Sequence, residues 1–360
     1  MLASYLGTSQ MDLFTPVVPA ERQHENFRRV LVPGRISERA VVTGWSEGFP
    51  DRDNKFINEF QTTFNSSFWE VYLYGVFKSY SFDMDWSQAR PDFWLSTPHG
   101  EIIVEAVTAN AAEGKEPEWD KKRLMSDPVA RKEFWPLNRE AIIRLSNALS
   151  SKVRKYNKSY KNLSHVPGKP FVIAVAPFEQ PDFQHQYDRA MRALLYNDYV
   201  DETAYFKDPA QFPDGPPSVR LDEITKDNGS TFDLGIFEND DWAEVSAVIF
   251  SCVATWGKAV AMSNDRRDGF IMASWGTDVS GKSEARRSRV GIPSEEIHDG
   301  LQIFHNPHAS NPVDLRVFRR KGVVQHYLSE GVWIREGYDN CLQFRFTYAS
   351  GLPLTDSPHR

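Results

Sequence analysis

The chain has few cysteines and no long apolar run, and both absences exclude classes of protein. Only two of its 360 residues are cysteines, too few for a disulfide framework or a zinc cluster. No run of about 18 apolar residues occurs, so we expect no membrane-spanning helix. The first residues lack a basic segment followed by a long apolar stretch, so we expect no secretory signal peptide. These features together predict a protein of the reducing cytoplasm.

The sequence also lacks excess positive charge, internal repeats and low-complexity tracts. Its formal net charge of −7 argues against tight, non-specific binding of nucleic acid over the whole surface. A local basic groove is still compatible with this charge, because a metal site itself requires carboxylates. Hydrophobic residues at 41% and charged residues at 25% are typical of a globular protein. The sequence leaves the oligomeric state open, homo-oligomers included.

The pattern of apolar residues divides the chain into three parts. Residues 1–50 contain several prolines and little periodicity, and we interpret them as an irregular N-terminal arm. Apolar residues then recur at four-residue spacing from Phe56 to Val76, which predicts one amphipathic helix over 53–80. This helix opens a predicted core over residues 51–180, and residues 181–360 are interpreted as a C-terminal α/β elaboration packed on that core.

Short strands and a second helix complete the predicted core. The segment Pro98-His99-Gly100 is a turn, so the strands on either side of it are predicted to form a hairpin. In order, we predict strands at 81–86, 92–96 and 101–108, a helix at 137–160 and a buried strand at 171–176. This order predicts an α/β fold, α-β-β-β-α-β, in which helices flank a mixed sheet.

The C-terminal part is predicted to be a mixture of short elements. Its predicted elements are a helix at 186–197 and strands at 232–237, 245–253, 269–274, 301–304 and 342–346.

Two carboxylates stand where neighbouring predicted strands meet. Asp92 opens the second strand after Pro91, and Glu105 lies in the apolar third strand between Val104 and Ala106. A carboxylate in a buried strand is costly unless it binds something. Mg²⁺ prefers such hard oxygen ligands and can support phosphodiester hydrolysis. The alternatives are that Asp92 caps a turn and that Glu105 is one half of a buried ion pair.

The Pro91-Asp92 pair, followed thirteen residues later by Glu105, resembles the motif of the PD-(D/E)xK (restriction-endonuclease-like) nuclease superfamily. The predicted order of helices and strands is similar to the core of that family. The resemblance covers about a third of the chain. It implies an Mg²⁺- or Mn²⁺-dependent nuclease acting on DNA, with a role in restriction or antiphage defence. It also implies that a glutamate on the first helix joins Asp92 and Glu105 at the metal.

One position departs from the family motif. The lysine expected two residues after Glu105 is replaced by Val107. Some family members carry this lysine on a neighbouring helix, and Lys152 fits that pattern because it lies about 20° from Leu145 on the inward side of the second helix. Lys155 lies further round and is the weaker candidate. Val107 favours an alternative function, a catalytically degenerate module that binds nucleic acid or protein. The alternative for Lys152 is an ordinary surface lysine with no catalytic role.

Two glutamates compete for the place on the first helix. Glu59 and Glu70 would lie about 16 Å apart along a straight helix, so only one could reach the metal. We prefer Glu70, which is closer in sequence to Asp92, and interpret Glu59 as solvated. Glu70 as a purely structural residue is the alternative.

The second predicted helix is strongly basic. No acidic residue occurs from 141 to 169, and Arg144, Lys155 and Lys158 are candidates for binding a phosphate backbone. A plain solvated face is the alternative interpretation.

Two further motifs are interpreted as coincidental. Residues 276–283 match the phosphate-binding pattern GxxxxGK[ST], but the segment after Lys282 and Ser283 lacks the apolar face of the required helix. His305 and His308 flank Pro307, which would break a helix that aligned them on a metal, so we predict a structural turn.

Overall fold

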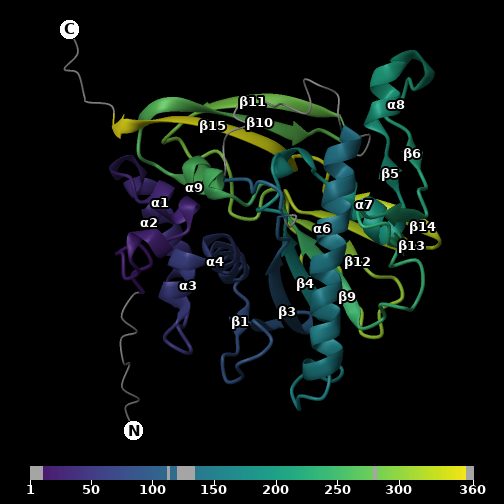
Figure 1. Cartoon of the computed structure of the whole chain (residues 1–360), viewed down its shortest axis with the longest axis horizontal. Coiled ribbons are helices and arrows are strands. Elements are labelled where there is room, and N and C mark those ends of the chain that lie inside the picture. Colours follow the sequence, from purple (N-terminus) through teal and green to yellow (C-terminus); the bar gives the residue numbers. More distant parts are fainter. Residues whose placement is uncertain (1–10, 112–113, 120–133, 279–281, 354–360) are drawn as a thin grey trace.

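An eight-stranded mixed sheet runs through the computed structural model, which describes residues 11–111, 114–119, 134–278 and 282–353 (Figure 1). In spatial order the strands are β1 (Asp83–Met84), β2 (Phe93–Thr97), β3 (Gly100–Thr108), β4 (Phe171–Ala176), β9 (Val245–Phe250), β12 (Gln302–His305), β13 (Val324–Ser329) and β14 (Val332–Glu336). Strands β2 and β3 form the predicted antiparallel hairpin, whereas β4 lies parallel to β3 and β9 parallel to β4. The second half of the chain therefore completes the same sheet as the first.

The predicted order of helix, three strands, helix and strand is present. Helix α4 (Phe64–Ser79) precedes β1, and helix α6 (Phe134–Lys155) connects β3 to its parallel neighbour β4. Both helices contact β3, and the Trp69 indole of α4 donates to the Ala174 carbonyl of β4 at 3.0 Å. The last turn before residue 161 is a π-helix, Tyr156–Tyr160. All six residues of β4 are buried, as its apolar sequence predicts for a strand covered on both faces.

The single helix predicted over 53–80 is wrong in one respect, because it is broken in two. Helix α3 (Phe56–Thr62) ends at Thr63, whose φ of −124° and ψ of 49° are not helical, and α4 begins at the next residue. The aromatic spacing continues across the break because Phe60 and Phe64 pack edge to face, with ring centroids 5.2 Å apart. A four-residue period therefore cannot distinguish one straight helix from two helices that share a core.

The irregular arm predicted for residues 1–50 is also wrong for the part that the structure describes. It contains η1 (Ala20–Arg22), α1 (Glu25–Val30), η2 (Pro33–Arg35) and α2 (Ile36–Ser46). Helix α2 packs closely on α4, where a Cβ added to Gly75 would lie 2.9 Å from the Cβ of Trp45. A glycine makes this approach feasible. The buried side of α2 carries Glu38 and Ser46 beside Val42 and Trp45, so its apolar periodicity is weak.

A three-stranded antiparallel sheet, β11 (Ser283–Arg289), β10 (Arg267–Gly276) and β15 (Leu342–Pro353), lies apart from the large sheet, across the top of Figure 1 above α9 (Trp256–Met262). The sequence predicts β10 and part of β15, whereas β11, β13, β14 and α9 were missed. The remaining elements are η5 (Phe183–His185), α7 (Arg189–Tyr196), β5 (Tyr199–Val200), α8 (Glu202–Lys207), η6 (Pro209–Gln211), β6 (Ser218–Val219), β7 (Glu223–Thr225) and β8 (Thr231–Asp233). Among the described residues, no helix is both long and apolar enough to cross a membrane.

Candidate active site

The hairpin brings the two motif carboxylates together. Phe93 pairs with Val104, so Asp92, one residue before β2, lies across from Glu105. The Asp92 Oδ2 accepts a hydrogen bond from the Ala106 backbone N–H at 2.8 Å. Asp92 is therefore tied to the opposite strand and does not merely cap a local turn.

Glu105 is fully buried and receives two lysines from the end of α6. The Nζ atoms of Lys152 and Lys155 each donate to its Oε1 at 2.7 Å. Its Oε2 is also buried and has no hydrogen-bond partner in the part of the chain that the structure describes. Glu105 thus has one oxygen free to accept a further ligand, and the Tyr160 hydroxyl lies close to the same carboxylate.

The cation missing at Val107 is therefore supplied from another element. Lys152 and Lys155 are three residues apart, so both ammonium groups reach the same side of α6. The preference for Lys152 over Lys155 is not supported by distance, since both stand at 2.7 Å. Their side chains differ in exposure, 17% for Lys152 and 43% for Lys155.

Glu70 approaches the same site from α4. Burial raises its pKa to about 8, and the neighbouring charges of Asp92, Glu59 and Glu105 add to the shift. Burial likewise raises the pKa of Asp92 to about 6, with the charge of Glu105 adding to it and Lys152 opposing it. The three carboxyl groups Glu70, Asp92 and Glu105 therefore form one electrostatically coupled cluster.

Glu59 lies outside the cluster, but its charge reaches Glu70. Its charge acts on the pKa of Glu70 although a continuous helix would hold the two far apart. The break at Thr63 changes the path of the chain between them. The side chain of Glu59 is exposed, as predicted for a solvated residue.

The charge of Glu105 itself is stabilised. Burial opposes its ionisation, but the ammonium groups of Lys152 and Lys155 outweigh burial and hold the pKa of Glu105 below its usual value. Glu105 therefore loses its proton at lower pH than Glu70 and Asp92, whose pKa values are raised.

Tyr160 is a member of the site that the sequence did not reveal. It is buried beside the lysines, with the Lys155 Nζ 5.1 Å from its ring centroid. Burial raises the pKa of its hydroxyl well above the ordinary value, and the charges of Glu105 and Asp92 add to the shift. A tyrosine within a lysine-rich stretch carries no pattern that would have distinguished it.

The donor set suits a hard divalent cation in its chemistry, although no complete ligand group is formed. Among the described residues, no three histidine, cysteine, aspartate or glutamate side chains are close enough together to hold an ion. Mg²⁺ commonly uses only one or two protein carboxylates and completes its shell with water and phosphate oxygens. The unpartnered Glu105 Oε2 and the neighbouring carboxyl of Asp92 fit that requirement.

Two of the three predicted phosphate-binding residues already pair with carboxylates. Arg144 donates to Glu140 at 2.7 Å, and Lys155 binds Glu105. Lys158 lies exposed in the π-helical turn. Of these three candidates, only Lys158 has a side chain without a carboxylate partner in the part of the chain that the structure describes.

The motifs interpreted as coincidental have no site geometry. Lys282 and Ser283 lead into strand β11, so no helix N-terminus follows the phosphate-binding pattern, whose residues 279–281 lie outside the described residues. His305 is buried and bonded to Gln325 at 2.9 Å, whereas His308 is exposed.

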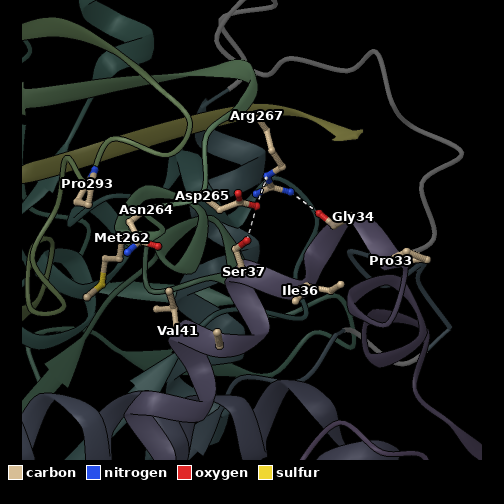
Figure 2. A pocket seen from close by; sticks show the side chains of 11 residues that line it. Pro33, Gly34, Ile36, Ser37, Val41, Met262, Asn264, Asp265, Arg267 and Pro293 are labelled. Carbon is tan, nitrogen blue, oxygen red and sulfur yellow. Dashed lines mark hydrogen bonds and ion pairs between the residues drawn. The ribbon is translucent and has the colours of Figure 1, made fainter. Parts of the chain in front are cut away.

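Two hollows in the surface lie away from the carboxylates. A groove of about 970 Å³ between α2 and the start of β10 is lined by residues such as Val41 and Met262 (Figure 2). Figure 2 shows its polar groups facing one another: Ser37 donates to Asp265 at 2.5 Å, and Arg267 binds the Gly34 carbonyl. Neither this groove nor a second hollow of about 390 Å³ is lined by Glu70, Asp92 or Glu105. The larger groove therefore lacks the chemistry of the carboxylate cluster.

No protein-family model matches the chain, and neither a curated protein nor a solved structure matches it. The fold and the geometry of the carboxylate cluster are therefore the basis for interpreting this protein.

Proposed function

We propose that the protein is a divalent-metal-dependent nuclease that hydrolyses phosphodiester bonds, with DNA as its substrate. The observation that carries the proposal is the contact of Lys152 with Glu105, across from Asp92. This contact supplies the cation that Val107 cannot, from a helix next to the motif strand. The order α4-β1-β2-β3-α6-β4 is the order expected of a PD-(D/E)xK core.

Each member of the cluster has a role in this proposal. Asp92 and Glu105 would hold Mg²⁺ or Mn²⁺, and Glu70 would assist once it has lost its proton. The bound ion would lower the pKa of water and stabilise charge on the phosphate. The hydrogen bond from Ala106 fixes the orientation of the Asp92 carboxylate before substrate arrives.

The lysines act on the substrate side of the cluster. An ammonium group within 2.7 Å of Glu105 can orient a water molecule for attack and stabilise the negative charge that develops on the phosphate. Lys152 is the better placed for this role because its side chain is the less exposed of the two. Lys155 reaches solvent and is suited to contact the phosphate backbone.

A catalytically degenerate module that binds nucleic acid or protein is the second candidate. The observation that favours it is the absence of a preformed three-ligand group among the described residues. In that case the two lysines would serve only to neutralise Glu105. The candidates differ in whether the wild type cleaves DNA, and a nuclease should lose that activity on substitution of Asp92.

The direct test is cleavage of single-stranded, duplex and supercoiled DNA with Mg²⁺ or Mn²⁺. We expect cleavage by the wild type, none in EDTA, and none by Asp92→Asn. Asp314→Asn is the matched control, because Asp314 pairs with exposed Arg316 away from the cluster. Cleavage by Asp92→Asn at the wild-type rate would refute the assignment, and an inactive wild type would favour the binding module. A role in restriction or antiphage defence would follow from an active enzyme only by analogy of fold.

A further inference from the structure

One face of the three-stranded sheet exposes large apolar side chains that a soluble surface seldom gathers. Met272 is 46% exposed, Phe346 51% and Tyr348 56%. The opposite face carries Ile271 and Trp275, which are buried against the rest of the molecule. The exposed face therefore has no cover among the described residues, and such patches commonly mark interaction sites.

The strand register arranges this face as two mixed rows. Phe270 of β10 pairs with Tyr348 on one side and Arg289 on the other, and Met272 pairs with Phe346 and Arg287. Phe270 is the centre, with its ring centroid 5.7 Å from that of Tyr348 and 6.2 Å from that of Phe346. The Arg287 guanidinium lies 4.7 Å from the Phe270 centroid. Aromatic rings thus form a platform bordered by arginines; we call it the aromatic face.

The arginines of the aromatic face are not neutralised. No ion pair forms with Arg287 or Arg289 among the described residues, and both side chains are exposed. Arg286, which points to the opposite side, differs because it pairs with Glu284 at 2.5 Å. The acidic residue of strand β10 is Asp268, which lies at the beginning of the strand. Unpaired positive charge therefore borders the exposed rings.

The aromatic face continues over the edge of β15 into the hollow of about 390 Å³. Phe346 belongs to both, and the hollow is further lined by Phe344, Trp256 and Arg29. Its volume lies within the range of sites for small molecules. A chain crossing the aromatic face could thus place one of its groups in this hollow.

We propose that the aromatic face binds single-stranded nucleic acid. Unpaired bases would stack on Phe270, Phe346 and Tyr348, while the phosphates contact Arg287 and Arg289. Exposed aromatic side chains on a sheet bind single strands in this way, because every base has an aromatic face and the backbone is anionic. A duplex offers no free base faces to such rings, and a second copy of the chain would bury the unpaired arginines of both copies.

This inference deepens the proposed function by naming single-stranded nucleic acid as the partner bound away from the carboxylate cluster. It rests on the proposed function only for its biological purpose. The three-stranded sheet that carries the aromatic face lies above α9 in Figure 1, whereas β3 belongs to the large sheet below. Binding can therefore be measured with the carboxylate cluster disabled.

The test is fluorescence anisotropy with the full chain carrying Asp92→Asn, in EDTA. The probes are a 15-nucleotide oligothymidylate, the matching oligouridylate and a 15-base-pair duplex. We expect tighter binding of the single strands than of the duplex, and the two single strands distinguish DNA from RNA as the source. Phe346→Ala and Tyr348→Ala should each weaken binding about fivefold or more. Arg287→Glu/Arg289→Glu should weaken it further and reduce its salt dependence.

Arg220→Glu/Arg316→Glu is the matched control, because it changes the net charge equally at exposed arginines elsewhere. It should bind like the parent, and thermal unfolding should be alike for all variants. Equal binding by all variants, or a preference for duplex, would overturn the inference. So would concentration-dependent self-association that Phe346→Ala abolishes, which would identify a second copy as the occupant. Binding without cleavage by the wild type would overturn only the nuclease assignment, and cleavage without this binding would overturn only the present inference.

Discussion

Among the buried carboxylates that receive two cations, Glu295 and Glu105 differ in how completely they are satisfied. Glu295 accepts from Arg345 through both oxygens, at 2.6 and 2.7 Å, and from Lys258 at 2.5 Å. The Lys258 Nζ also donates to the carbonyls of Glu296 and Asp299. Glu105 instead has both lysines on one oxygen and leaves the other unpartnered among the described residues.

The surroundings of Glu295 and Glu105 also differ, in solvent exposure and in the number of neighbouring carboxyl groups. All three side chains of the Glu295 cluster are essentially inaccessible to solvent. The Glu105 cluster contains further carboxyl groups with raised pKa values, and Lys155 reaches solvent. Glu38 also has two cations on one oxygen and leaves the other without a hydrogen bond, so an unused oxygen alone does not mark a cation site. The excess of neighbouring carboxyl groups with raised pKa values is the feature expected of a site that binds a cation. Burial of charge alone would not have separated the two.

The largest expected effect is on activity. Glu105→Gln should lower the rate of DNA cleavage on the order of a thousandfold or more, because a metal ion contributes several kcal/mol of transition-state stabilisation. Arg345→Lys, which alters the Glu295 cluster, should leave the rate near that of the wild type at temperatures where the protein is folded. Cleavage rates with saturating Mn²⁺ measure both. A similar loss in the two variants would remove the distinction between the clusters.

The second expected effect is on stability, where substitution of Glu295 should have the larger effect. Glu295→Gln should lower the free energy of unfolding by about 3–5 kcal/mol, because it leaves two buried cations without a full partner. Glu105→Gln should cost less, since the released Lys155 is already 43% exposed and can be hydrated. Urea titrations followed by circular dichroism provide the comparison. A greater loss for Glu105→Gln would mean that Glu105 is the structural group.

A smaller effect should separate the two lysines. Lys152→Met should lower the turnover rate about a hundredfold while divalent-metal binding persists, because it removes a cation that acts on the reacting phosphate. Lys155→Met should lower it about tenfold or less and should mainly weaken DNA binding. Turnover under saturating DNA, set against affinity in EDTA, distinguishes these roles. Equal turnover losses would show that the lysines act as one unit.

The smallest effect concerns pH. The folded-state pKa values of Glu70, about 8, and Asp92, about 6, lie above those of the unfolded chain. Their contribution to stability is therefore present in acid and is lost as pH rises through about 6 and then 8. We compare the fall in Tm between pH 5.5 and pH 8.5 in the two proteins without metal. This fall should be about 2 °C or more larger for the wild type than for Glu70→Gln. Added Mg²⁺ should reduce this loss, because metal binding favours the ionised carboxylates. A constant difference between the two proteins would contradict the raised pKa of Glu70.

The parts of the core with strong local signals could be predicted from the sequence. The apolar run of β4 and the turn after β2 each allow one interpretation, so the hairpin that joins Asp92 to Glu105 followed directly. Lys152 could be placed because it shares the inward side of α6 with Leu145. These features depend on neighbouring residues or on one helical period.

The rest depends on contacts between distant segments. The break at Thr63 is concealed because α3 and α4 share one aromatic core. Helix α2 packs on α4 at Gly75, a contact that the sequence of α2 does not indicate. Strand β11 consists mostly of charged residues and becomes a strand by pairing with β10. The equal distances of Lys152 and Lys155 from Glu105 depend on how α6 sits on the sheet, which no sequence period specifies.

The most direct test of the central claim is calorimetric titration of Mn²⁺ or Mg²⁺ into the wild type and into Asp92→Ala/Glu105→Ala. The titrations should be repeated with a non-cleavable DNA present, because phosphate oxygens would complete the shell of the ion. We predict binding by the wild type and none by the double variant, with unchanged circular dichroism. Absence of binding by the wild type even with DNA, or equal binding by the double variant, would contradict a metal site at Asp92 and Glu105.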